Sequence, residues 1–481
     1  MSFCPVHPKP LKTKASFLWM YLFKRRSWMD GLFERSYRMK MGEVHLPGLD
    51  LYMVNEPRLW KQVLVDEAPD FPKHELLGHA LEPLLGESIF TTNGAQWQRQ
   101  RDMMEKSFEA ARIKHVFGLM RDAADAMRDR LDALPDAVEH DVELEMTHVT
   151  ADIIFRTILS TPLEGEDAQR IFRAFSRFQE LAPKLIMPVI FRWPRLFHPW
   201  LAARASKAAA KEIRGVLEGF IRPRHDAWAA ARASAQATAP AAASAGKPAC
   251  PFNADGPDDI LSSLLDAVDP ATGTHFSFKE LVDQVAMLFL AGHETSASAL
   301  SWSLYLIANA PDIQQRMHDE VMAECGDRPI GFAELRGLEL VRNVFRETLR
   351  LYPPVGFFAR ATPAPRRMRD KHLPADSTIV IAPWLIHRHR DYWERPDDFD
   401  PDRYAGEAAR ESLKNAYLPF SAGPRVCIGA AFALQEAALI LATLVRRYRF
   451  EPLASHVPEP VGRLTIRSEN GIRLAVHKRA G

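Results

Sequence analysis

Cysteine is scarce in this 481-residue chain, which has four: Cys4, Cys250, Cys325 and Cys427. They lie far apart, without a CxxC pair or a His/Cys cluster at zinc-ligand spacing. The sequence therefore predicts neither a disulfide framework nor a structural zinc site. This cysteine usage is typical of a reducing compartment, and we expect a cytoplasmic protein.

Long apolar runs are also missing. The longest early run covers residues 17–23, and Lys24-Arg25-Arg26 follow it. This is far short of the roughly 20 residues that a membrane-spanning helix needs, and no small-residue cleavage site follows, so we expect neither a transmembrane segment nor a signal peptide. Two interpretations of the run stay open: an ordinary docked first helix, or aromatic and basic residues that contact a membrane surface.

Neither sign of charge is in excess, because 62 lysines and arginines face 61 aspartates and glutamates. A net charge of +1 gives no reason to expect a nucleic-acid partner. The length suffices for several average domains or for one large domain with a deep interior. We expect one domain over residues 1–481 and a monomer.

Helical patterns dominate what is present. Apolar residues recur every three to four positions over residues 112–134, 142–159 and 205–228. Residues 229–257 are rich in alanine, serine and proline and have few large apolar side chains. They cannot bury enough surface to order themselves firmly, so we expect a flexible surface linker between two helices.

Strand patterns are few. Alternating apolar residues occur in residues 43–54 and 378–382. The clearest hairpin pattern covers residues 464–476, where Asn470-Gly471 separates two alternating runs. The sequence therefore predicts a mainly α fold with small β-sheets.

The longest predicted helix begins at the capping box Ser277-Phe278-Lys279-Glu280 and runs to Asn309 before Pro311 stops it. Its centre reads AGHETS, residues 291–296, a weak helical stretch because glycine, threonine and serine disfavour or bend a helix. Such an inconsistency often marks a functional site. A glycine packed beneath another helix explains it equally well.

Glu347 and Arg350 lie three residues apart on one helix face, and the helix ends at once because two prolines follow. Arg403 lies in the irregular, proline-punctuated segment 396–404. Irregular coil must satisfy its backbone groups. We therefore expect the pair to tether this segment, although such pairs are commonly solvated.

Cys427 lies in the loop FSAGPRVCIG, residues 420–429. By itself the stretch is compatible with a small buried thiol at a turn, the usual state of a free cysteine. Gly423 and Gly429 also permit the main chain to approach another group closely. The loop alone leaves both interpretations open.

Four motifs in one order, AGHETS, ExxR with LYPPV, PDDFDPDRY and FSAGPRVCIG, resemble the cytochrome P450 superfamily of haem-thiolate monooxygenases. The resemblance runs from the region of Trp97 to the terminal strands, apart from the 229–257 segment. It implies the P450 fold, a triangular prism of helices with a long central helix over the haem.

The resemblance also assigns the cofactor site. In that family the loop cysteine is the axial ligand of haem iron, so Cys427 would hold the iron of haem b, and cations would hold the two propionates. By position, the residues implied in haem binding besides Cys427 are Trp97, Arg101, Ala291, Gly292, Arg360, Phe420, Gly423, Arg425 and Gly429. Glu347, Arg350 and Arg403 would be structural.

Glu294 and Thr295 match the family's acid–alcohol pair, which supplies protons during activation of O2. The pair favours a monooxygenase that inserts one atom of O2 by hydroxylation or epoxidation. Two alternatives stay open: a peroxide-driven oxygenase, and a haem protein that senses a ligand without turnover. His293 occupies a variable position of the motif, and we expect a spectator there rather than a proton relay.

We expect no electron source within the chain, since only some fifty residues follow Cys427. We therefore expect electrons from NAD(P)H to arrive through a ferredoxin or flavodoxin with its reductase. Surface candidates for meeting an acidic partner are Lys414, Arg425 and Arg446.

A hydrophobic small molecule is the expected substrate, because the positions that line the pocket in the family are mostly apolar here. These positions are the segment 71–90 and Phe289, Leu290, Ala291, Val355, Phe357, Phe358, Glu469 and Asn470. Phe357 and Phe358 are equally compatible with core packing.

Overall fold

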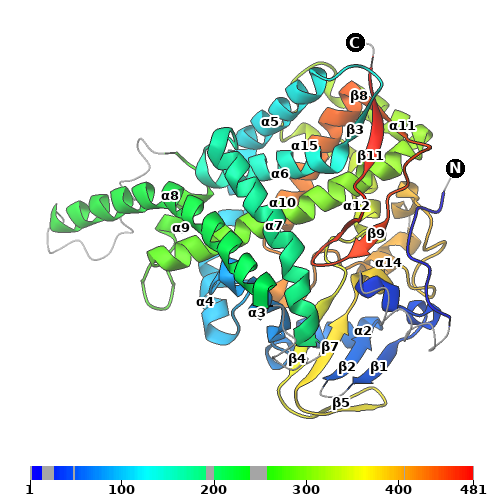
Figure 1. Ribbon diagram of the computed structural model, residues 1–481, viewed down its shortest axis with the longest axis horizontal. Helices are drawn as coiled ribbons and strands as arrows, with labels where there is room; N and C mark the ends of the chain where they lie inside the picture. The colour runs from blue at the N-terminus through cyan, green and yellow to red at the C-terminus, as the bar shows by residue number, and fades with distance from the viewer. Residues whose placement is uncertain are drawn as a thin grey trace.

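The computed structural model describes residues 3–12, 27–46, 49–190, 200–238, 257–405 and 407–479. Most of these residues are helical, which confirms the predicted fold class (Figure 1). The α-helices are α2 (Pro57–Lys61), α3 (Glu75–Leu85), α4 (Gly94–Glu105), α5 (Ala110–Asp132), α6 (Val142–Leu159), α7 (Gly165–Ile190), α8 (Trp200–Thr238), α9 (Ile260–Asp266), α10 (Phe278–Ala308), α11 (Pro311–Cys325), α12 (Glu339–Leu351), α13 (Pro383–Ile386), α14 (Glu407–Ala416) and α15 (Ala430–Arg447).

The strands form small sheets. One four-stranded sheet has the order β1-β2-β7-β4 and lies below the helices in Figure 1; β3-β11-β8 is three-stranded, and β10-β9 and β5-β6 are pairs. The strands are β1 (Met41–Leu46), β2 (Leu49–Val54), β3 (Val138–Asp141), β4 (Phe358–Thr362), β5 (Arg366–Met368), β6 (Lys371–Leu373), β7 (Ser377–Ile381), β8 (Tyr448–Pro452), β9 (Pro460–Gly462), β10 (Ile466–Ser468) and β11 (Arg473–Lys478).

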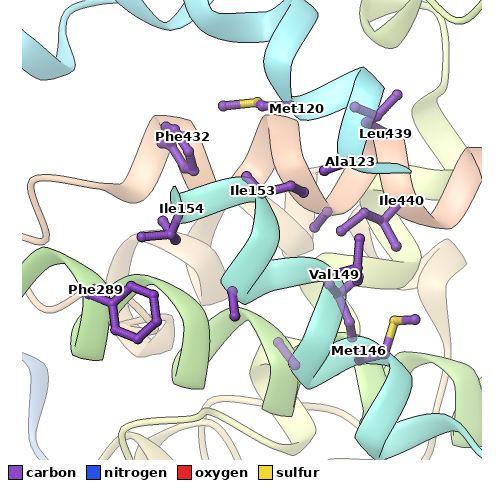
Figure 2. Close-up of a cluster of buried hydrophobic side chains, with 14 of the residues drawn as sticks. Met120, Ala123, Met146, Val149, Ile153, Ile154, Phe289, Phe432, Leu439 and Ile440 are labelled. Atoms are coloured by element: carbon purple, nitrogen blue, oxygen red, sulfur yellow. The ribbon is translucent and has the colours of Figure 1, made fainter. Parts of the chain in front are cut away.

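The main core surrounds α10, which crosses the middle of the molecule (Figure 1). Side chains from α5, α6, α10 and α15 meet in one buried cluster, in which Ile154 of α6 lies between Phe432 of α15 and Phe289 of α10 in the view of Figure 2. Burial of apolar surface is the main favourable term in folding. It fixes α10 between its neighbours, and α10 carries the predicted acid–alcohol pair.

The predicted helices at 112–134 and 142–159 are confirmed as α5 and α6. The predicted helix at 205–228 is too short, because α8 extends to Thr238. Residues 229–238 are therefore helical and not linker, since their alanines favour helix. The remaining predicted linker falls largely on residues 239–256, which lie outside the described residues.

The apolar run at 17–23 and the basic residues after it also lie outside the described residues. Among the helices that the structure describes, none combines the length and the apolar composition that crossing a bilayer requires.

The predicted hairpin over 464–476 is wrong. Gly471 has φ +76°, so the Asn470-Gly471 signal did locate a turn. The strands on its two sides belong to different sheets, however, because β10 pairs with β9, and β11 pairs with β3 and β8. Local turn chemistry cannot reveal that partners more distant in sequence compete for each strand.

The long helix is confirmed, with the predicted capping box between Ser277 and Glu280. Its weak centre stays helical throughout. A Cβ at Gly292 would lie 2.5 Å from Cδ1 of Ile154, so a larger residue there would force the Ile154 side chain of α6 to move. The packing interpretation of Gly292 therefore holds, and it does not compete with a functional role for its neighbours.

Candidate functional site

The loop between α14 and α15 carries Cys427. The backbone N–H of Cys427 donates to the carbonyl oxygen of Phe420 at 2.9 Å, which closes the loop. Gly423 has φ +70°, and a Cβ there would overlap the carbonyl oxygen of Leu64, so only glycine fits. Gly429 differs, because its φ is −87° and a Cβ would meet none of the described atoms within 4 Å. The backbone therefore requires glycine at position 423 and not at position 429.

The Cys427 side chain is enclosed but still accessible. Burial raises the pKa of its thiol, and the backbone N–H of Gly429 and the charge of Arg101 oppose that rise. Even so, the residue keeps a large exposed fraction. The thiol is therefore surrounded by protein and still accessible to a ligand.

One face of α10 is also accessible, and we call this accessible face the opening of α10. From Leu281 to Ala308 the helix is buried except at Ala291, Gly292 and Thr295, which keep partial exposure. Ala291 and Thr295 are four residues apart and therefore share a face. Next to them, Ser296 Oγ donates to Glu436 Oε2 of α15 at 2.7 Å, so this part of α10 contacts the helix that follows Cys427.

Arg360 and Lys73 are brought together by main-chain pairing. Arg360 lies on β4, and Lys73 forms an isolated antiparallel bridge with it. Arg425, two residues before Cys427, lies within electrostatic reach of both cations. The sequence predicted Arg360 and Arg425 as cofactor cations but missed Lys73, which carries no motif and approaches them only through the fold.

These three cations repel one another. Burial lowers the pKa of Arg360 to about 10, and burial together with Arg360 lowers that of Arg425 to about 10. Burial, then Arg360 and Arg425, lowers the pKa of Lys73 well below its ordinary value. Within the described residues the three bond only to neutral oxygens, with no carboxylate among their partners. Enclosed cations without anions form a site that favours an anionic ligand.

Trp97 and Arg101 of α4 both contact the cysteine loop. The guanidinium of Arg425 lies 4.2 Å from the centroid of the Trp97 ring, a cation–π contact. Arg101 Nη1 donates to the carbonyl oxygen of Val426 at 2.8 Å. The two residues, predicted to share one helix face, thus position the loop and its arginine.

This arrangement fits haem. An accessible thiol can hold the iron as thiolate. Neighbouring cations without carboxylate partners, Lys73, Arg360 and Arg425, can hold two propionates by charge-assisted hydrogen bonds.

Glu294 of α10 is 4% exposed, and each of its carboxylate oxygens accepts a short hydrogen bond. Gln179 Nε2 of α7 donates to Oε2 at 2.6 Å, and Thr465 Oγ1 donates to Oε1 at 2.7 Å. Thr295 Oγ1 donates to the carbonyl oxygen of Ala291 at 2.7 Å. Gln179 and Thr465 were not predicted, because they approach Glu294 from distant parts of the chain.

His293 points away from the opening. Its Nδ1 bonds to the carbonyl oxygen of Phe289 at 2.8 Å, and its ring packs edge-on against Phe175 at 4.9 Å. Burial lowers the pKa of His293 to about 4, so the imidazole is neutral. These contacts support the spectator interpretation.

Glu347 forms the predicted tether. Arg350 donates to both of its oxygens at 2.8 Å, and Arg403 Nε donates to Oε1 at 2.8 Å. Arg350 also donates to backbone carbonyls of Pro396 and Asp398, in the irregular segment. Glu347 and Arg350 are fully buried, so the solvated-pair alternative is wrong.

Phe289 does not lie at the opening. It is 2% exposed and packs against Phe155 and Phe175, with ring centroids 5.3 and 4.7 Å apart, because it points towards α6 and α7. Leu290 is likewise buried in the core, at 5%. Phe71 is 1% exposed and packs with the sheet.

Val355, Phe357 and Phe358 keep partial exposure. Phe357 packs edge-on against Trp28 at 5.3 Å between ring centroids. Trp28 occupies space that a Cβ at Gly356 or at Gly462 would need. Sequence reasoning missed Trp28, because its contacts depend on two glycines far away in the chain.

Glu469 and Asn470 were predicted at the pocket and lie elsewhere. Both are exposed, Glu469 is paired with Arg463, and Asn470 Nδ2 donates to the carbonyl oxygen of Val457 at 2.9 Å. They belong to the connection that leads from β10 away to β11. The segment that reaches α10 is instead the β9–β10 turn, through Thr465.

The three cations predicted to meet an acidic partner differ in their position and exposure. Lys414 is exposed, whereas Arg425 is turned inwards over Trp97. Arg446 lies sixteen residues into α15, about 24 Å along the helix from its start, and donates to the carbonyl oxygen of Arg328 at 2.8 Å. Only Lys414 keeps the character expected of a docking residue beside the loop.

Comparisons with known proteins agree with this site. A sequence model described as Cytochrome P450 matches residues 9–473. Cyclooctatin synthase of Streptomyces melanosporofaciens is 31% identical over 412 residues, which are 85% of this chain and 83% of that protein. Cyclooctat-9-en-7-ol 5-monooxygenase of the same organism is 29% identical, with 85% and 82% covered. Cytokinin hydroxylase of Arabidopsis thaliana is 28% identical, with 88% and 78% covered.

A solved structure supports the fold. The crystal structure of the cytochrome P450DA heme domain superposes with a TM-score of 0.79, at 21% identity and with 98% of each chain covered. At that identity the likeness concerns the fold alone, and the family rests on the sequence matches. The chain therefore belongs to the cytochrome P450 family, as a monooxygenase whose family membership implies haem and O2.

Proposed function

We propose that this cytochrome P450 inserts one atom of O2 into an apolar organic substrate, by hydroxylation or epoxidation, with electrons from a separate partner. NAD(P)H would be the source, and a ferredoxin or flavodoxin with its reductase the carrier. The observation that carries the proposal is the opening of α10 at Ala291 and Thr295, beside Glu294 and next to the helix that follows Cys427.

In this proposal each residue has a distinct task. Cys427 holds the iron as thiolate, and Lys73, Arg360 and Arg425 hold the propionates. Haem bound there supplies the chemistry of O2 binding and reduction. Glu294 delivers protons, and Thr295 orients them, because its hydroxyl lies on the accessible face and is anchored to Ala291 at 2.7 Å.

An apolar substrate is supported by the partly exposed side chains proposed to line the pocket. Val355 and Phe357 keep accessible surface without charge, and Leu464 in the β9–β10 turn is also partly exposed. Apolar lining selects ligands by shape and by burial of apolar area. The printed name of one relative, cyclooctat-9-en-7-ol 5-monooxygenase, describes oxygenation of an alkenol, which is compatible with this class.

The first test addresses Cys427. Reduced protein with carbon monoxide should show the strongly red-shifted Soret band of thiolate ligation. Cys427→Ser should lose that band, whereas Cys4→Ser, which changes an exposed free cysteine, should keep it. A red-shifted band in Cys427→Ser would refute the ligand assignment.

The second test separates O2 activation from peroxide use and from sensing. Thr295→Ala should divert electrons into hydrogen peroxide while product per electron falls at least tenfold, about 1.4 kcal/mol in the transition state. Thr295→Ser keeps the hydroxyl and should stay coupled. If Thr295→Ala couples electrons to product as well as wild type does, Thr295 has no role in proton delivery. If product forms only when peroxide is added, the peroxide-driven alternative is favoured. If the protein turns over no apolar compound, the sensor alternative is favoured.

A further inference from the structure

A second carboxylate, that of Glu143, shares Arg467 with Glu294. Glu143 is in the first turn of α6 and is 9% exposed. Arg467 of β10 lies between the two acids: its Nη1 is 3.5 Å from Glu143 Oε1, and its Nε is 3.9 Å from Glu294 Oε1. The side-chain exposures of Arg467, Glu143 and Glu294 are 23%, 12% and 5%, so Arg467 and Glu143 are both more accessible to solvent than Glu294.

Neither contact is a tight ion pair. Charge-assisted hydrogen bonds between nitrogen and a carboxylate measure about 2.7–2.9 Å, well below both distances. Glu145, two residues further along α6, provides the contrast, because Arg130 Nη2 donates to it at 2.6 Å. Arg467 is thus shared loosely between two acids, whereas Glu145 is held in a closed structural pair.

Several polar atoms in this group have no protein partner. Among the described residues, Oε2 of Glu143 and both Nε and Nη2 of Arg467 are buried and make no hydrogen bond. Native proteins satisfy such atoms with ordered water. Because Glu143 and Arg467 both carry such atoms, this group has the character of a hydrated path.

Glu143 can exchange protons near neutral pH. Burial raises the pKa of its carboxyl to about 7, Asp141 and Glu294 add to the rise, and Arg467 opposes it. These are the charged groups that face Glu143 from the N-cap of α6, from α10 and from β10. A proton donor or acceptor works best when its pKa is close to the operating pH.

We propose that Glu143 is a proton-relay residue for Glu294: it takes a proton from solvent and passes it, through water positioned by Arg467, to the carboxylate of Glu294. Each proton that leaves Glu294 towards the accessible face of α10 is replaced by the one from Glu143, and solvent reloads Glu143. The inference rests on the proposed function, because the relay matters only if Glu294 delivers protons.

The test uses the haem-loaded enzyme with a substrate that wild type converts. Glu143→Gln keeps the shape of the side chain but not its titration. It should lower product per electron several-fold, raise hydrogen peroxide to match, and leave the carbon monoxide band unchanged. Glu143→Asp should restore most of the coupling, and Glu145→Gln is the matched control with similar burial.

The pH profile separates a relay from a structural role. In wild type, product per electron should fall as the pH rises through about 7, because Glu143 then no longer carries a proton. Glu143→Gln should lose this inflection, and Glu145→Gln should keep it. A variant that merely unfolds would lose activity at every pH and would also lose the haem band.

A second readout does not depend on turnover. Infrared difference spectra should show a protonated-carboxyl band that disappears as the pH rises through about 7, in wild type and in Glu145→Gln but not in Glu143→Gln. The band of Glu436, whose pKa burial raises to about 8, should be present in all three proteins. If wild type is coupled and Glu143→Gln matches it at every pH, the relay is wrong while the proposed function stands. If wild type never couples electrons to product, the proposed function itself fails.

Discussion

Two groups of buried arginines in this protein show opposite ways of enclosing charge. Around Glu347, two arginines and the hydroxyl of Tyr404, at 2.9 Å, satisfy one carboxylate. Around Arg360, by contrast, Lys73 and Arg425 bring further positive charge without a carboxylate partner among the described residues. The first group is electrostatically complete, and the second is incomplete.

The difference separates structure from ligand binding. Although burial alone would raise the pKa of Glu347, Arg350 and Arg403 hold it below its ordinary value, so the group is stable as it stands. The cations near Arg360 lower each other's affinity for protons instead. Buried charge that the fold itself does not satisfy is a candidate for a ligand, and an anionic ligand would restore the balance.

Glu436 represents a third way of enclosing a charged group. It is 1% exposed and lies between α10 and α15, where Ser296 donates to it, and among the described residues no cation contributes to its pKa. Burial raises its pKa to about 8, and Ser296 opposes the rise. The protein therefore keeps this acid neutral near pH 7 instead of pairing it.

The largest effect on stability should come from removing the carboxylate of the electrostatically complete group around Glu347. Glu347→Gln leaves Arg350 and Arg403 buried without a counter-charge, and breaking one partner of a buried pair costs about 3–5 kcal/mol. We expect little folded, haem-containing protein, measured by urea unfolding and by haem content. Arg316→Ala removes an exposed pair with Asp402, whose loss should cost less than about 1 kcal/mol. Equal stability of the two variants would contradict the comparison.

The next largest effect on stability depends on pH. Between pH 4.5 and about 8 the folded protein holds a proton on Glu436 that the unfolded chain has released, so raising the pH favours unfolding. This one group should destabilise the wild type by about 1.4 kcal/mol per pH unit in that range.

Glu436→Gln removes the titration and should flatten the stability profile over the same range, with little change at low pH. Thermal unfolding of both proteins from acid to mildly alkaline pH measures this difference. Parallel profiles would mean that Glu436 is ionised in the folded protein, which would break the distinction between neutralised and paired acids.

The smallest effect should come from removing a cation from the electrostatically incomplete group around Arg360. Lys73→Met removes an enclosed cation that has no carboxylate partner, so the fold should remain intact. Haem release should become about tenfold faster, which corresponds to about 1.4 kcal/mol, as measured by transfer to an excess of apomyoglobin. Lys414→Met, at an exposed lysine, is the control. Unfolding of Lys73→Met would show that this lysine is structural, as Glu347 is.

Local sequence patterns predicted the secondary-structure elements well, but they predicted poorly which distant segments contact one another. The capping box at Ser277 and the periodicity of α6 depend on neighbours in sequence, and both predictions are confirmed. The hairpin at Asn470-Gly471 failed because strand pairing is decided by distant segments. The same limit explains why Lys73 was missed and why Phe289 was assigned to the pocket, although it faces α6 and α7.

The amino-acid sequence by itself determined the family, the order of its motifs and the identity of the cysteine proposed as the iron ligand, because these depend on residue type and spacing along one chain. Only the tertiary structure decided which charges are satisfied. Electrostatic balance depends on distances between residues far apart in sequence, such as Glu143, Glu294 and Arg467, and on how deeply the fold buries them.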